Sequence, residues 1–154
     1  MVVKKSKSKS LENAKIKNAT HVKCGSIEFK SKLEHTVYKT LIEAGFKPAY
    51  EKRTYTLIDS FKPTVLFFTK NKAKDLHLDN KTIRKTTYTP DFTFKYKGYF
   101  VIVEAKGFVN GVYPLKKKLF RQVLERTAEF EKILFFEVYS KTNVLQMIDV
   151  LKEL

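Results

Sequence analysis

Two short apolar runs, residues 88–96 and 99–106, constrain the fold of this chain more than any other feature. The Lys97-Gly98 dipeptide between them is typical of a tight turn, so the sequence predicts a β-hairpin. The second run begins with five consecutive apolar residues, as expected of a strand covered on both faces. We therefore expect this hairpin to lie at the centre of a sheet.

The remaining chain carries helical and strand-like patterns in alternation. Helices are expected where apolar residues recur at helical spacing: from between Ser26 and Ser31 to Ala44, from Pro114 onward, and over about residues 142–154. Strands are expected at residues 48–58, 64–69 and 132–139, with a loop or hairpin insertion over 70–85. This order predicts an α/β domain with a central mixed β-sheet flanked by helices.

The charge balance points to a polyanionic partner. Lysine and arginine number 31 against 16 acidic residues, which gives a net charge of +15. Residues 1–25 hold seven lysines and one glutamate, and we expect them to form a flexible basic arm before a folded domain over 26–154. Because +9 remains on the domain, the obvious partner is nucleic acid.

Several other classes of protein are disfavoured. A single cysteine, Cys24, excludes an intramolecular disulfide and a cysteine-based metal cluster and suits a reducing compartment. His21, His35 and His77 lack the spacing of a zinc site. No apolar run approaches the length of a membrane span, and the N-terminus lacks the apolar core of a secretory signal. We expect a cytoplasmic protein without a membrane partner.

Three charged residues stand at the ends of the expected hairpin strands. Asp91 opens the first strand, Glu104 interrupts the apolar run of the second, and Lys106 follows on the same strand face. Each has an ordinary explanation alone, as a strand end or an exposed ion pair. A carboxylate within an apolar run, however, costs free energy unless a metal or hydrogen bonds compensate it.

These residues are suited to metal-dependent hydrolysis. Mg²⁺ prefers carboxylate and carbonyl oxygens, so Asp91, Glu104 and the backbone carbonyl of Ala105 are candidate metal ligands. Lys106 is a candidate for orienting or deprotonating a water, or for stabilising negative charge in the transition state.

Glu34, on the first expected helix, has two competing interpretations. Ser31-Lys-Leu-Glu34 fits a capping box, in which the Glu34 side chain binds the start of the helix. Glu34 also borders the apolar stripe, so it does not lie on the fully polar side. The helix pattern alone favours capping over catalysis.

The charged residues resemble the pattern of the PD-(D/E)XK nuclease superfamily and, within it, the bacteriophage endonuclease I family of Holliday-junction resolvases. The matching segments are Tyr88-Thr-Pro-Asp-Phe92, Val103-Glu-Ala-Lys-Gly107 and Ser31-Lys-Leu-Glu34. The resemblance implies a restriction-endonuclease-like core, a catalytic role for Glu34, and Mg²⁺ as cofactor with Mn²⁺ as a substitute. The segment 57–84 is longer than in the resolvases, where the neighbouring segment helps to bridge two subunits.

The sequence thus predicts a metal-dependent, structure-selective DNA endonuclease, a homodimeric Holliday-junction resolvase of phage type that acts in DNA recombination in the host cytoplasm. A symmetric junction needs two incisions, and a two-fold dimer supplies two sites. One alternative is a PD-(D/E)XK endonuclease that acts on duplex DNA or replication intermediates. Another is a DNA-binding accessory protein with a vestigial nuclease site.

Basic residues that flank the hairpin in sequence are candidates for DNA binding. They are Arg84, Lys85, Lys116, Lys117, Lys118 and Arg121. A charge run on a helix is usually a solvated face, so this assignment follows from placement rather than from a motif.

Overall fold

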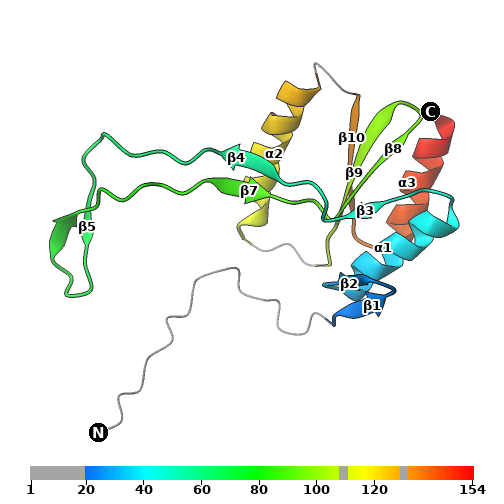
Figure 1. The fold of residues 1–154 in the computed structure, drawn as a ribbon, viewed down its shortest axis with the longest axis horizontal. Helices are drawn as coiled ribbons and strands as arrows, with labels where there is room; N and C mark the ends of the chain where they lie inside the picture. Colours follow the sequence, from blue (N-terminus) through cyan, green and yellow to red (C-terminus); the bar gives the residue numbers. More distant parts are fainter. Residues whose placement is uncertain (1–19, 108–110, 129–131) are drawn as a thin grey trace, which may run out of the picture.

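The computed structural model describes residues 20–107, 111–128 and 132–154 and has the α/β architecture that the sequence predicts (Figure 1). Its central four-stranded sheet has the order β10 (Ile133–Val138), β9 (Tyr99–Ala105), β8 (Phe92–Tyr96) and β3 (Ala49–Tyr50). β10 runs parallel to β9, whereas β8 is antiparallel to both β9 and β3. The predicted mixed sheet is therefore confirmed.

The predicted hairpin is formed by β8 and β9. Tyr96 pairs with Tyr99 across Lys97 and Gly98, whose φ angles are 44° and 81°. Positive φ at both positions is what a type I′ turn requires, and glycine adopts it without steric cost. β9 is buried from residue 100 to residue 105, so the expectation of a central strand covered on both faces is also confirmed.

All three expected helices form. They are α1 (Lys32–Glu43), α2 (Tyr113–Thr127) and α3 (Lys141–Glu153). Ser31 caps the start of α1, and Gly45, at φ 88°, follows its end. Pro114 lies in the first turn of α2. Proline lacks a backbone N–H, but N–H groups in the first turn have no hydrogen-bond acceptor within the helix, so nothing is lost there.

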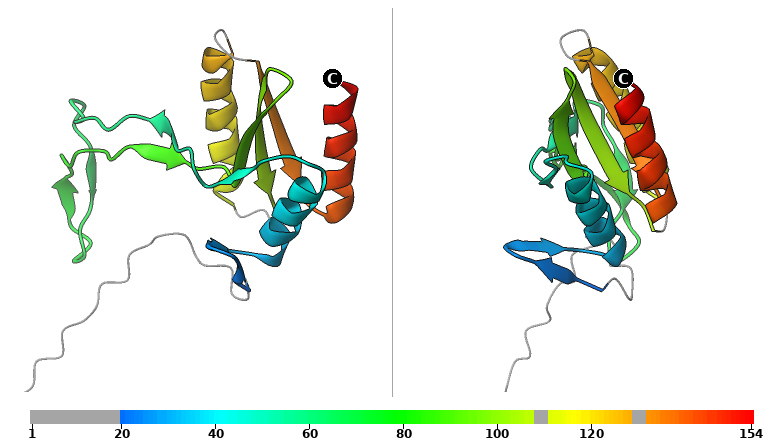
Figure 2. Two further views of the ribbon diagram at one scale, coloured as in Figure 1. Left: turned by 45° about the vertical axis from the view of Figure 1, so that its right-hand side comes forward. Right: turned by 90° about the vertical axis from the view of Figure 1, so that its right-hand side faces the viewer.

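The helices cover both faces of the sheet (Figure 2). α1 and α3 pack together over one face, against Val101 and Val103 of β9. α2 covers the other face, where Phe100 and Ile102 join its apolar residues. Because α2 is the crossover between the parallel strands β9 and β10, both strands end at the same edge of the sheet.

The segment 48–58 is not the single strand that the sequence predicts. β3 ends at Tyr50, and Glu51 follows with φ 43°, a left-handed conformation that turns the chain out of the central sheet. The chain resumes as β4 (Tyr55–Ile58), which pairs with β7 (Thr86–Tyr88) beside α2.

Between β4 and β7 the chain projects away from the core as a long extension (Figure 1). We call residues 59–85 the β5–β6 extension, because β5 (Phe68–Lys70) and β6 (Leu76–Leu78) pair at its far end. The hairpin expected within 70–85 is therefore present, and its first strand, β5, begins at Phe68. The strand expected at 64–69 is largely absent and is replaced by the short β5.

Two short strands precede α1, and the sequence analysis did not predict them. β1 (Val22–Cys24) pairs with β2 (Ile27–Phe29), and Gly25 lies between them with φ 60°. β1 falls inside the expected arm 1–25, so the described fold begins before residue 26. The rest of the expected arm, residues 1–19, lies outside the described residues.

None of the helices in the described ranges has the length and hydropathy that a bilayer crossing requires.

Candidate active site

The hairpin brings Asp91 and Glu104 together at one end of the sheet. Phe92 pairs with Val103, so the next position of the antiparallel register sets Asp91 opposite Glu104. The backbone N–H of Ala105 donates to Asp91 Oδ2 at 2.7 Å, which fixes the Asp91 carboxylate against β9. The predicted convergence of these two carboxylates is thus a property of one hairpin.

Glu104 is buried, and one of its oxygens lacks a hydrogen bond of ordinary geometry. Only 3% of the residue is exposed, and Oε1 lies 2.5 Å from Lys106 Nζ. Lys106 Nζ also lies 4.1 Å from the centroid of the Tyr113 ring, which adds a cation–π contact. Within the described ranges Glu104 Oε2 and the Tyr88 hydroxyl form no hydrogen bond of ordinary geometry, although the two side chains lie close enough to interact. A buried acceptor of this kind costs about 1–3 kcal/mol when it stays unpaired.

The electrostatics of the site favour a cation. The pKa of Asp91 is raised well above its usual range by burial first, then by the charges of Glu104 and Glu34. The Ala105 N–H and Lys106 act in the opposite direction and lower it. Burial and the charge of Glu104 likewise raise the pKa of Tyr88. Carboxylates that repel one another in this way are stabilised when a divalent cation binds between them.

Glu34 takes part in the cap of α1, whose N-cap residue is Ser31, although its carboxylate binds Lys30 N in place of the Ser31 N–H of a standard capping box. Its backbone N–H donates to Ser31 Oγ at 3.1 Å, and its carboxylate accepts from Lys30 N at 2.9 Å and from Ser31 Oγ at 2.9 Å. The Tyr50 hydroxyl donates to the same carboxylate at 2.6 Å. Capping is therefore confirmed. The negative charge of Glu34 also raises the pKa of Asp91, so Glu34 lies close enough to interact electrostatically with the candidate site.

The donor set fits Mg²⁺, although no complete metal cage is formed. Within residues 20–107, 111–128 and 132–154 no three acidic, histidine or cysteine side chains are grouped to hold a metal ion. Asp91 and Glu104 nevertheless offer oxygen donors of the type that Mg²⁺ prefers. A cation would give Glu104 Oε2, which forms no hydrogen bond of ordinary geometry, a partner, and it would offset the negative charge that raises the pKa of Asp91. The part expected of the Ala105 carbonyl stays a prediction.

Sequence reasoning missed one acidic neighbour, Glu137. It pairs with Glu104 across the parallel strands β9 and β10, so both side chains leave the same face of the sheet. The Tyr113 hydroxyl donates to Glu137 Oε1 at 2.5 Å, and Lys117 Nζ lies 3.0 Å from Oε2. The available signal was a carboxylate inside the apolar run 133–138, the same signal that marked Glu104.

The candidate DNA-binding residues fall into two groups. Arg84 and Lys85 are exposed on the β5–β6 extension, just before β7. The other four, Lys116, Lys117, Lys118 and Arg121, lie on α2. Of these, Lys117 forms an ion pair with Glu137, the strand neighbour of Glu104. Lys118 and Arg121 are exposed.

The fold and the site define an α/β protein in which a hairpin gathers two carboxylates and a lysine. The chain belongs to the DUF1064 family, described as a protein of unknown function, whose model matches residues 14–141. That range includes Glu34, Asp91, Glu104, Lys106 and Glu137. No curated protein and no solved structure matches the chain.

Proposed function

We propose that this protein is a Mg²⁺-dependent endonuclease that hydrolyses phosphodiester bonds in branched DNA, as a homodimeric Holliday-junction resolvase. The observation that carries the proposal is the convergence of Asp91 and Glu104 beside Lys106, in a chain of net charge +15. The resemblance of these residues to the PD-(D/E)XK pattern and the mixed sheet between helices support a restriction-endonuclease-like core.

Each residue of the site has a task in this chemistry. Asp91 and Glu104 would hold Mg²⁺, which would supply positive charge beside the phosphate and lower the pKa of a bound water. The Ala105 N–H holds the Asp91 carboxylate in place from the second strand. Lys106 Nζ, held between Glu104 Oε1 and the Tyr113 ring, orients the attacking water or stabilises the negative charge that develops on phosphorus oxygens.

Two basic surfaces support DNA rather than a small substrate. Lys118 and Arg121 are exposed on α2, which covers the same face of the sheet as Glu104. Arg84 and Lys85 are exposed on the β5–β6 extension next to β7. Exposed cations on these two elements would provide contacts for the phosphates of a bound strand.

The β5–β6 extension supports a dimer. Its exposed large apolar side chains are Phe61, Val65, Leu66, Phe67, Phe68, Leu76, Leu78 and Ile83. Val65 is 81% exposed and Leu76 is 76% exposed, on an element that projects from the core (Figure 1). Apolar patches of this kind mark protein interaction sites. A second copy of the chain that covers the patch provides the second active site that paired incision needs.

The proposal is tested by cleavage of four-way junctions, forks and linear duplexes in Mg²⁺, Mn²⁺ or EDTA. We expect the junction to be cut in either metal and no cutting in EDTA, with Asp91→Asn as the inactive control. Equal cutting of all three substrates would indicate a duplex endonuclease instead. Tight DNA binding without cleavage in either metal would indicate an accessory protein.

A further inference from the structure

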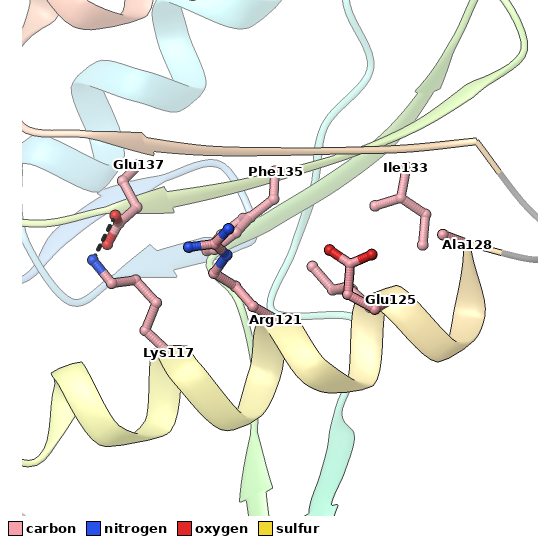
Figure 3. Close-up of a pocket in the computed structure, with 8 residues that line it drawn as sticks. Lys117, Arg121, Glu125, Ala128, Ile133, Phe135 and Glu137 are labelled. Carbon is pink, nitrogen blue, oxygen red and sulfur yellow. Dashed lines mark hydrogen bonds and ion pairs between the residues drawn. The ribbon is translucent and has the colours of Figure 1, made fainter.

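A pocket of about 480 Å³ lies between α2 and β10 (Figure 3). Lys117, Arg121 and Glu125 point from successive turns of α2 toward β10, as Figure 3 shows. Ile133, Phe135 and Glu137 face them from alternate positions of the strand. The volume falls within the ~300–1,000 Å³ of small-ligand sites.

One end of this pocket borders the candidate active site. Glu137, which lines the pocket, is the strand neighbour of Glu104. Tyr113 links the two regions, because its hydroxyl binds Glu137 and its ring contacts Lys106 Nζ. The Glu137 end of the pocket is therefore separated from Lys106 by the side chain of Tyr113.

The chemistry of the lining changes along α2. Nearest the active site, Lys117 is paired with Glu137 at 3.0 Å. One turn further, Arg121 is exposed and forms no ion pair with any described residue. One turn beyond that, Glu125 offers a carboxylate that can accept from a base amino group.

Beyond Glu137 the opposite wall is apolar and includes an aromatic ring. Phe135 is half-buried and rests edge-to-face on Phe120, with ring centroids 5.3 Å apart and an interplanar angle of 86°. Ile133 lies on the same strand, and Leu124 and Ala128 add apolar lining from the side of α2. A free guanidinium beside an apolar and aromatic wall matches the two halves of a nucleotide, its phosphate and its base.

We propose that this pocket binds the nucleotide next to the scissile phosphate, with its phosphate on Arg121 and its base against Phe135. The inference rests on the proposed nuclease function and deepens it. A paired base is stacked in its duplex, so an unpaired nucleotide enters such a pocket more easily than a paired one. The pocket therefore selects strands that have an unpaired base beside the cut, as branched or distorted DNA provides.

Arg121→Ala tests the phosphate contact, with Arg126→Ala as the matched control. Arg126 is exposed on the same helix, carries the same charge and does not line the pocket. Binding is measured by fluorescence anisotropy in the Asp91→Asn background, on a duplex and on the same duplex with unpaired nucleotides. We expect Arg121→Ala to weaken binding to the unpaired substrate about tenfold and to reduce the salt slope by about one. We expect Arg126→Ala to stay within about twofold.

Phe135→Leu tests the base contact. The probe is 2-aminopurine at an unpaired position, whose fluorescence falls when the base stacks on a ring. We expect quenching by the protein with Phe135 and restored fluorescence with Phe135→Leu, in a variant shown to be folded by thermal melting. An unquenched probe at every unpaired position would overturn the base contact.

The two proposals fail in distinguishable ways. If the protein cuts DNA in Mg²⁺ but Arg121→Ala and Arg126→Ala bind alike, the pocket assignment is wrong and the nuclease stands. If no DNA is cut but Arg121→Ala selectively loses the unpaired substrate, the nuclease proposal is wrong and the pocket is a nucleotide site.

Discussion

Ala105 donates its backbone N–H to Asp91 Oδ2 across 2.7 Å, so the two hairpin strands are joined where their carboxylates meet. This bond lowers the pKa of Asp91, whereas burial and the charge of Glu104 raise it. The raising effects are larger, and the charged form of Asp91 is therefore disfavoured until a cation arrives.

Asp91→Asn should abolish cleavage in Mg²⁺ while DNA affinity stays within a few-fold. The amide keeps the shape and can still accept from Ala105, but it lacks the charge that holds a divalent cation. In EDTA the variant should melt higher than the parent, by roughly 2–4 °C for each kcal/mol recovered in a chain of this size. Retained cutting would remove Asp91 from the site.

The stability gap between the parent and Asp91→Asn should depend on pH. Because the folded pKa of Asp91 is raised, its contribution to stability is fully present below the unfolded value, near 3.9, and is lost as pH rises through the folded pKa. The metal-free parent should thus lose stability relative to the variant as pH increases. Thermal melts of both proteins in EDTA across pH 4–8 measure this, and a constant difference would contradict it.

Lys106→Ala and Glu104→Gln should fail for different reasons. Glu104→Gln removes a metal-binding charge, so both Mg²⁺ affinity and cleavage should be lost. Lys106→Ala removes the ammonium 2.5 Å from Glu104 Oε1 and should lower the rate more than the Mg²⁺ affinity. The rise in Tm with Mg²⁺ concentration reports affinity separately from rate. An equal loss of affinity in both variants would make Lys106 a structural partner of the metal site.

Glu34→Gln separates capping from catalysis. Three donors point at this carboxylate: Lys30 N, Ser31 Oγ and the Tyr50 hydroxyl. A glutamine has only one oxygen to accept them, so we expect a modest loss of stability, about 0.5–2 kcal/mol. We expect cleavage to fall by orders of magnitude while junction binding is kept, because glutamine lacks the carboxylate charge. Near-normal cutting by Glu34→Gln would show that Glu34 serves only to cap the helix.

Removal of residues 1–19 should leave a folded and active protein. This deletion spares β1, which pairs with β2 beside α1. It should weaken DNA binding and make log affinity depend less steeply on log salt, because phosphate contacts are lost. An unchanged salt slope would mean that these residues do not touch the phosphates.

The sequence was most informative where neighbouring residues determine the structure. The turn at Lys97-Gly98 and the cap at Ser31 depend on a few adjacent residues, and both formed as predicted. Asp91 and Glu104 could be placed together because a single hairpin carries them.

Long-range contacts could not be predicted in the same way. The position of Glu137 beside Glu104 depends on the parallel register that the α2 crossover creates. The break after Tyr50 depends on a left-handed residue, Glu51, whose type gives no turn signal. The pocket beyond Glu137 likewise exists only because α2 packs against the sheet.

The two ends of the β5–β6 extension leave the core side by side, since Tyr55 pairs with Tyr88 and Ile58 with Thr86. Closing a loop between fixed neighbouring ends costs free energy that grows only slowly with loop length. Evolution can therefore lengthen, shorten or exchange this segment without displacing Asp91. The exposed apolar surface of the extension and the carboxylates of the hairpin are thus free to diverge at different rates within one family.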